Sequence, residues 1–562
     1  MKNLNILLGF VILTSVAACS DFLDVNPTGV LAEDVIAEPT NVDGFVTTAY
    51  SVLGNDHFQR PHSLWPYGNI RSDDAYKGGS GESDLIEYHY YEISEGITSR
   101  FGQADEIWYR MYVGISRANN AIRALEAISE DEYPLKEERI GEMRFLRGFF
   151  YFKLKILFNR IPFFDEDIPI ESYDRVSNTV YTSDELWDII AGDFRTAVDL
   201  LPQKRTDAGR VDKSAANAYL AKTLLYSAYE QDENYNVINI NHNKLEEVIL
   251  ACNQVEGNLE EDIANNFLPG PYENGVESIF AIQFSHDDGT EFGRLNWGDV
   301  LSVPMGVGCC DFQKPSQNLL DAFEVDPSTK LPLFSSFDDE YIDYTDIENH
   351  TMDPRLFHTI AIPGYPYKYL TNKVYNEGWN RNPNTYGYFA SLKENVDPDS
   401  EYLVHYDAFY GSSKNRIEMR YADVLLFKAE ALIELGRSGE ALPIINQIRE
   451  RAGKSTNMIP YATNIGVGLY TDGVNCTWNQ DFARQALRWE RRLEMALENS
   501  RFFDLVRWGI AGETLNAFYN KEKSARIYYS SAHFDEGTEE YCPIPQNQID
   551  FSQGLYTQNK NY

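Results

Sequence analysis

IEMRYADVLLFKAEALIELGRSGEALPIINQIRERAG, residues 417–453, is the stretch that determines the fold class. In its first half, apolar residues recur at helical spacing and stop at Gly436, the residue type that commonly follows the last turn of a helix. A second apolar run at the same spacing ends at Gly453. The stretch therefore predicts two helices that are joined by a tight reversal at 436–440 and pack against each other.

Similar apolar runs elsewhere in the chain predict three more helix pairs. They are 106–129 with 135–158, 183–201 with 213–230, and 481–499 with 501–518. Small residues at the predicted crossings resemble those of tetratricopeptide pairs, although the fixed period of about 34 residues is missing. Residues 142–158 are apolar nearly all round, which predicts a buried helix. We therefore predict a mostly α fold with tetratricopeptide-like helix pairs stacked in a right-handed superhelix.

Two other regions, about 55–100 and 260–415, are rich in Gly, Pro, Asn, Asp and Tyr and show few helical periods. Long irregular segments inside a compact protein are usually functional or disordered, and the many aromatic residues here favour folded loops. We predict one domain over 41–562. In it a helical scaffold, about 100–256 and 416–520, supports a loop-rich ligand-binding region.

The amino terminus predicts export. Lys2 precedes an apolar run at 6–16 that is too short to span a bilayer. Val-Ala-Ala-Cys at 16–19 resembles the lipobox of bacterial lipoproteins, which implies that residues 1–18 are a signal peptide and that Cys19 carries acyl chains. Residues 19–40 would then be an acylated stalk that leads to the folded domain.

The formal charge of −37 argues against nucleic acid as a partner, because such a surface repels phosphate backbones. It argues equally against an electrostatic grip on anionic lipid. Five cysteines follow Cys19, and their spacing fits no metal motif. For Cys309 and Cys310 we favour free thiols over a disulfide with a distant partner, and a bond between the two neighbours would be strained.

Motifs for catalysis are missing. The sequence contains no G-x-S-x-G, H-E-x-x-H or Walker A pattern, and its nine histidines are scattered. The acidic run 338–353 fits a solvated loop better than a calcium site, because it lacks EF-hand spacing. Arg491 and Arg492 fit structural ion pairing better than anion capture. We therefore predict no catalytic residues, no metal and no cofactor.

Binding of a sugar is the remaining chemistry that the composition supports. A sugar presents apolar C–H faces and many hydroxyls, which aromatic rings and Asp, Asn or Arg side chains can contact. Three predicted loops combine these residue types, and the candidate ligand-binding residues are Trp65, Tyr67, Arg71, Asp73, Asp74, Asn296, Trp297 and Trp379. Each tryptophan is equally well explained as a packed loop anchor. Arg71 and Asp73 are explained slightly better as a local ion pair than as ligand contacts.

Motifs distributed along the whole chain resemble the SusD/RagB family of outer-membrane nutrient-binding lipoproteins. They are ISRAN at 115–119, EMRFLRGF at 142–149, MDPR at 352–355, RYADVLLFKAE at 420–430, DLVRWG at 504–509 and PIP at 543–545. The departures are modest: Asn499 stands where the family often has glycine.

The resemblance implies a lipid-anchored protein on the outer membrane, facing the exterior. It would bind an oligo- or polysaccharide, catalyse nothing, and deliver the cargo to a SusC-type TonB-dependent transporter. Two alternatives stay open: a RagB-like member that binds peptide, and a surface glycoside hydrolase. Ligand residues vary between members, so the candidate residues rest on their chemistry alone.

Overall fold

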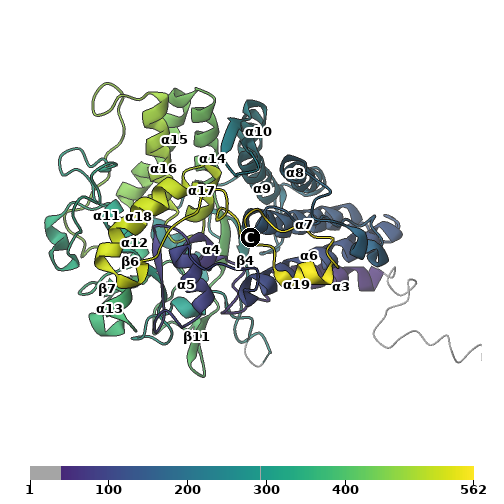
Figure 1. Cartoon of the computed structure of the whole chain (residues 1–562), viewed down its shortest axis with the longest axis horizontal. Helices are drawn as coiled ribbons and strands as arrows, with labels where there is room; N and C mark the ends of the chain where they lie inside the picture. Colours follow the sequence, from purple (N-terminus) through teal and green to yellow (C-terminus); the bar gives the residue numbers. More distant parts are fainter. Residues whose placement is uncertain (1–38, 291–292) are drawn as a thin grey trace, which may run out of the picture.

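The computed structural model describes residues 39–290 and 293–562. The predicted signal peptide, Cys19 and the predicted stalk up to residue 38 lie outside the described residues. Figure 1 shows most of the long helices at the top and right of the molecule, and irregular chain mixed with helices and strands at the left and bottom.

Helices dominate the described chain. They are α3 (Pro39–Tyr50), α4 (Trp65–Gly68), α5 (Ile86–Ile93), α6 (Gly102–Ala127), α7 (Lys136–Phe158), α8 (Ser183–Leu200), α9 (Lys213–Ala228), α10 (His242–Cys252), α11 (Gln317–Ala322), α12 (Leu356–Thr359), α13 (Pro383–Tyr386), α14 (Tyr421–Glu434), α15 (Ser438–Lys454), α16 (Gln480–Glu494), α17 (Arg501–Arg507), α18 (Ala511–Ala525) and α19 (Gln546–Phe551).

The long helices pack in chain order. α6 lies on α7, α7 on α8, α8 on α9, α9 on α10, α10 on α14, and α14 on α15. The predicted mostly α class, with helix pairs beside a loop-rich region, is confirmed. The pairs at 106–129 with 135–158, at 183–201 with 213–230 and within 417–453 are present with shifts of a few residues at their ends.

Local signals explain these helices. Thr182 caps α8: its side chain accepts from the Glu185 N–H, and the Glu185 side chain accepts from the Thr182 N–H, which together form a capping box. Helix α7 is buried on almost every side, as its apolar sequence predicts. The ring of Phe150 on α7 packs against Gly114 of α6, where a β-carbon would collide with it, so the glycine permits the close approach of the two helices.

The predicted pair at 481–499 and 501–518 is only partly correct. Helix α16 ends at Glu494, and Leu497 and Asn499 adopt left-handed backbone angles (φ 61° and 70°) that no helix tolerates. The second segment is two helices, α17 and α18, because Gly509 has φ 68° and ends the first of them.

Strands form only two-stranded antiparallel sheets in the described chain, pairing β1 with β5, β2 with β3, β4 with β12, β6 with β9, β7 with β8, and β10 with β11. Their bounds are β1 Ala75–Gly78, β2 Tyr229–Gln231, β3 Val237–Ile240, β4 Ser278–Ile282, β5 Phe312–Pro315, β6 Ile360–Ala361, β7 Pro366–Tyr367, β8 Leu370–Val374, β9 Ala390–Ser391, β10 Leu403–Tyr406, β11 Phe409–Ser412 and β12 Arg416–Arg420.

A buried set of ion pairs joins the loop-rich region to the helical scaffold. Arg355 of the loop-rich region reaches Glu494 of α16 at 3.1 Å. Arg451 of α15 reaches Glu277 at 2.7 Å, and Arg420 reaches Glu494 at 2.9 Å. We call these five side chains the charge seam. Removing one partner of a buried pair leaves an uncompensated charge, so neither region can lose its side chains of the seam without a cost in stability.

Cys309 and Cys310 form a disulfide with each other. The prediction of free thiols at these positions is therefore wrong, because each of the two sulfurs has its chain neighbour as partner, and no distant cysteine is needed. Cys252, Cys476 and Cys542 are free.

Among residues 39–290 and 293–562, no helix has the length and apolarity needed to cross a membrane. The same residues contain no group of three or more His, Cys, Asp or Glu side chains placed to hold a metal ion.

Candidate ligand-binding site

The first predicted loop lies in the protein core. Trp65 is 1% exposed, and its indole N–H donates to the Gly298 carbonyl at 2.9 Å. Tyr67 is fully buried and packs edge-on against Tyr88 and Tyr91. Neither ring offers a face to a ligand, so the prediction that Trp65 and Tyr67 are binding residues is wrong. Trp65 is instead a packed anchor, which is the second explanation that the sequence offered for it.

The charged residues of this loop are also buried. Arg71 does not pair with Asp73: it donates to the Glu539 carbonyl and lies 4.1 Å from the Phe502 ring centroid. Asp73 instead pairs with Arg501 at 2.9 Å and with Arg492 at 3.0 Å.

Asp74, which is fully buried, pairs with Arg492 at 2.8 Å. Burial raises the pKa of Asp73, but Arg492 and Arg501 outweigh it and hold this pKa below its usual value. The prediction that Arg71, Asp73 and Asp74 contact a ligand is therefore wrong, because all three serve ion pairs or packing within the fold. The predicted local ion pair between Arg71 and Asp73 is wrong as well.

Structural pairing is confirmed for Arg491 and Arg492. Arg491 contacts Asp423 at 2.7 Å and Asp504 at 2.9 Å, and both guanidinium groups are buried. The partners of both arginines are aspartates from other segments of the chain.

In the second predicted loop, Asn296 is buried and Trp297 is partly exposed. Asn296 is 2% exposed, donates to Asp299 at 2.7 Å, and bonds through its backbone N–H to the Ser412 carbonyl at 2.8 Å. It is therefore a structural residue, which corrects its prediction as a ligand contact. Trp297, the next residue, is half-buried and packs edge-on against Tyr406 and Phe409.

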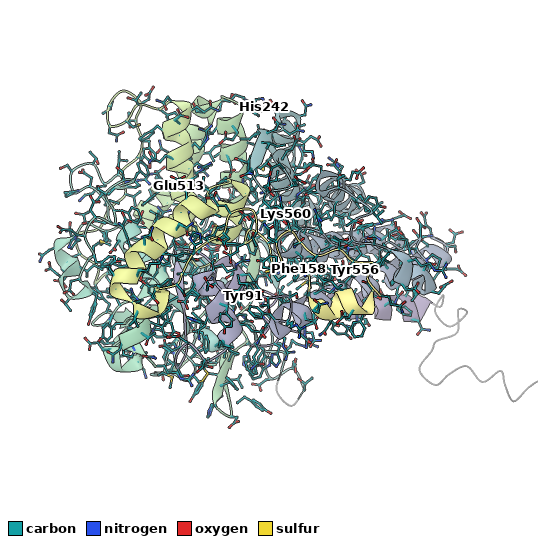
Figure 2. The ribbon with its side chains drawn as sticks, viewed as in Figure 1. Tyr91, Phe158, His242, Glu513, Tyr556 and Lys560 are labelled. Carbon is teal, nitrogen blue, oxygen red and sulfur yellow. A yellow bond between two sulfur atoms is a disulfide. The ribbon has the colours of Figure 1, made fainter. Side chains whose placement is uncertain are left out.

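Rings from three segments extend this surface. Phe409 lies 4.9 Å from Phe58, which stacks on His57 at 4.4 Å between ring centroids. We call His57, Phe58, Trp297, Tyr406 and Phe409 the aromatic patch. Two of its rings, Tyr406 and Phe409, lie at the tip of the β10–β11 hairpin. The strand β11 is at the lower edge of the molecule in Figure 1, and side chains project at this edge in Figure 2. Tyr406 is 41% exposed, and its ring centroid lies 5.8 Å from that of Trp297.

Trp379, the third predicted tryptophan, lies in a separate cluster. Its half-buried ring packs over Gly306 and against Tyr367 and Tyr375, with ring centroids 5.4 and 5.5 Å away. Its role in binding stays a prediction.

Buried polar groups hold the patch in place. One oxygen of Asp56 accepts from the backbone N–H groups of His57 and His62 at 2.9 and 2.8 Å, and the other pairs with Arg416 at 2.7 Å. Burial raises the pKa of Asp56, but His62 and Arg416 outweigh it and keep this pKa below its usual value. The charged carboxylate thus fixes the loop that carries Phe58.

The register of the β10–β11 hairpin determines which rings face Trp297. His405 pairs with Tyr410, and Tyr406 pairs with Phe409, in the β10–β11 register. Residues directly opposite each other share a face of the hairpin, so Tyr406 and Phe409 face Trp297 together.

Hydrogen-bond donors and acceptors lie close to the patch, because half-buried Gln59 and Arg60 follow Phe58 on its loop. Burial and the nearby Arg60 and Arg110 lower the pKa of His57, which keeps its ring neutral at pH 7.

Sequence reasoning missed four members of the patch: His57, Phe58, Tyr406 and Phe409. A signal existed for the last two. Aromatic residues flank Asp407–Ala408, and such a two-residue connection is typical of a hairpin tip, where side chains are exposed.

Comparisons with known proteins agree with this fold. A family profile described as "SusD family" matches residues 276–562. The chain belongs to the SusD family. A second profile, described as "Starch-binding associating with outer membrane", matches residues 21–225 of this SusD-family protein. The resemblance to SusD/RagB proteins is therefore confirmed.

Relatives match over nearly the whole length. SusD-like protein P2 from Formosa agariphila is 25% identical over 98% of both chains. A SusD-like carbohydrate binding protein from Bacteroides fragilis has a similar structure, with a TM-score of 0.70 and 21% identity over 93% of this chain and 99% of that chain. Surface glycan-binding protein A from Bacteroides thetaiotaomicron, in complex with laminarihexaose, gives a TM-score of 0.65 and 19% identity over 93% and 99% of the two chains.

Proposed function

We propose that this SusD-family protein binds an oligo- or polysaccharide at the aromatic patch. The observation that carries the proposal is the half-buried Trp297, held among Tyr406 and Phe409 beside Phe58. Flat apolar rings with polar neighbours suit the C–H faces and hydroxyls of sugars. A carbohydrate binding protein and a surface glycan-binding protein in complex with laminarihexaose share this fold, which supports the same ligand class.

The proposed activity is capture without catalysis. Glycosidases use a pair of carboxyl groups that flank the scissile bond. Beside the patch, Asp56 is committed to Arg416 and the loop backbone, and Asp299 accepts hydrogen bonds from Asn296 and Ser63. These engagements favour binding over a surface glycoside hydrolase.

Location and delivery form the second part of the proposal. The lipobox-like segment ending at Cys19 supports attachment to a membrane through acyl chains. The family description, which refers to the outer membrane, supports that site. We infer that the protein faces the exterior and passes its glycan to a SusC-type TonB-dependent transporter.

Isothermal titration calorimetry of the purified protein tests the binding proposal. The panel contains neutral and acidic oligosaccharides, with laminarihexaose among them, and peptides of similar length. We expect saturable binding of at least one oligosaccharide. Binding of peptides alone would replace the glycan proposal with the RagB-like alternative.

Two further assays test the other parts. Release of new reducing ends from a bound glycan would contradict capture without catalysis. For delivery, native membranes are solubilised in mild detergent and the protein is purified through an affinity tag. We expect a TonB-dependent transporter to copurify, and its absence under conditions that retain other outer-membrane complexes would refute the partnership.

A further inference from the structure

A groove outside the aromatic patch is lined by two arginines. It is a groove of about 360 Å³ between the end of α3, the 208–210 loop, β4 and Arg294. Its main lining residues are Thr47, Tyr50, Gly54, Gly209, Arg210 and Arg294. We call it the basic groove, because two guanidinium groups and no carboxylate line it among the described residues.

The lining of the groove differs from the chain as a whole. The sequence has 86 acidic residues and 49 Lys and Arg residues, whereas the lining of this groove has two arginines and no carboxylate among the described residues. A concave site that contains charge of one sign concentrates its field and raises the local concentration of oppositely charged ligands.

The two arginines differ in how far they are neutralised. Arg210 donates to Glu142 at 2.8 Å and lies 5.5 Å from the Tyr50 ring centroid. Arg294 is exposed, and no carboxylate among the described residues lies within salt-bridge distance of it. Its guanidinium therefore keeps its full donor capacity for a ligand.

Arg294 is nonetheless held in place through its backbone and stem. Its N–H and carbonyl bond with Ser285 at 2.8 and 2.9 Å. Its Cγ and Cδ atoms lie 3.8 Å from the position that a β-carbon on Gly54 would take. An ordered stem reduces the entropy cost of orienting the guanidinium on a ligand.

Two short chain segments connect the lining of the basic groove to the aromatic patch. Arg294 precedes Trp297 by three residues, and Gly54 precedes Phe58 by four. Fully extended chain covers at most about 3.6 Å per residue, so the Cα atoms are at most about 11 and 14 Å apart. One short oligosaccharide can reach both surfaces.

We propose that the basic groove is a subsite for an anionic substituent, a uronate carboxylate or a sulfate ester, on a glycan whose neutral rings lie against the aromatic patch. This inference rests on the proposed function and narrows it to acidic glycans. Arginine suits the role because its planar fork can donate two parallel hydrogen bonds to a carboxylate or sulfate.

The test uses pairs of glycans that differ only in charge. The first pair is an oligogalacturonate and its fully methyl-esterified form, and the second is a carrageenan oligosaccharide and its desulfated form. In calorimetry at 50 mM NaCl, we expect the acidic member of at least one pair to bind about tenfold more tightly than its neutral counterpart. The preference should shrink at 500 mM NaCl, because salt screens exposed charges.

Two substitutions and a control connect the preference to the groove. Arg294→Ala should abolish it and Arg294→Lys should reduce it, because lysine keeps the charge and loses the planar fork. Arg195→Ala is the control: it removes an exposed arginine on α8, which is paired with Glu247 away from the groove. It changes the net charge by the same amount and should leave the preference intact.

The outcomes separate the two proposals. A preference in one pair alone identifies carboxylate or sulfate as the substituent. Equal affinity within both pairs, or a preference that survives Arg294→Ala, overturns the anionic subsite while glycan binding stands. If calorimetry detects no binding of any oligosaccharide, neutral or acidic, the proposed function fails and the subsite fails with it.

Discussion

Replacing Trp297 with alanine is the sharpest test of the aromatic patch. The indole is half-buried, and its partners Tyr406 and Phe409 meet it edge-on. A sugar ring that stacks on it would cover about 60 Å² of apolar surface, which at about 25 cal/mol per Å² is worth about 1.5 kcal/mol. We therefore expect Trp297→Ala to raise the Kd by about tenfold.

The assay is calorimetry at 25 °C with the glycan that binds most tightly in the panel. Trp297→Phe keeps a ring and should lose less than Trp297→Ala. Tyr109→Ala is the matched control, because Tyr109 is a 59% exposed aromatic residue on α6, outside the patch. A Kd for Trp297→Ala within twofold of the wild-type value, with an unchanged melting temperature, would refute the stacking argument.

Three further predictions concern the support of the patch and the stability of the fold. Trp65→Phe removes the hydrogen bond to the Gly298 carbonyl, and we expect a loss of about 1–2 kcal/mol in the free energy of unfolding, measured with urea; an unchanged denaturation midpoint would contradict this. Asp56→Asn deprives buried Arg416 of one carboxylate, which should cost about 2–3 kcal/mol at pH 7 and lower the melting temperature. Since the pKa of Asp56 is lowered in the fold, its contribution is present above its unfolded pKa of about 3.9 and disappears as pH falls through the folded pKa, so wild type and variant should converge in acid. Burial raises the pKa of Glu539 to about 8, so its ionisation destabilises the fold as pH rises from about 4.5 to 8. Glu539→Gln should therefore raise the free energy of unfolding at pH 9 by up to about 5 kcal/mol, with a higher melting temperature, and leave both unchanged at pH 4.

The helical scaffold was predictable because its signals are local. Apolar spacing over 142–158 and over 417–453 marks α7, α14 and α15, and Gly436 marks the reversal between the last two. The error at 481–499 arose where amphipathic spacing continues past the true end of α16. Its decisive feature, the left-handed backbone at Asn499, follows from contacts with a distant segment: the Asn499 N–H bonds to Asn69 at 2.9 Å.

The binding surface was only partly predictable because burial is decided by tertiary packing. Trp65 and Trp297 both lie in segments that the sequence predicts to be polar loops, and the two look alike in the sequence. The hydrogen bond from Trp65 to Gly298 joins residues 233 positions apart. That contact buries one tryptophan beneath the loop that presents the other, and no local pattern encodes it.

The charge seam limits how a protein of this design can be given a new specificity. Exchanging all of 260–415 with the equivalent region of a relative would remove Glu277 and Arg355. Arg451 and Glu494 would then lose these ion-pair partners at the junction of the two regions. Grafts should therefore stay small. The hairpin tip and the loop that carries Phe58 lie outside the seam. Their sequences can therefore be changed to bind a different ligand while the charge seam stays intact.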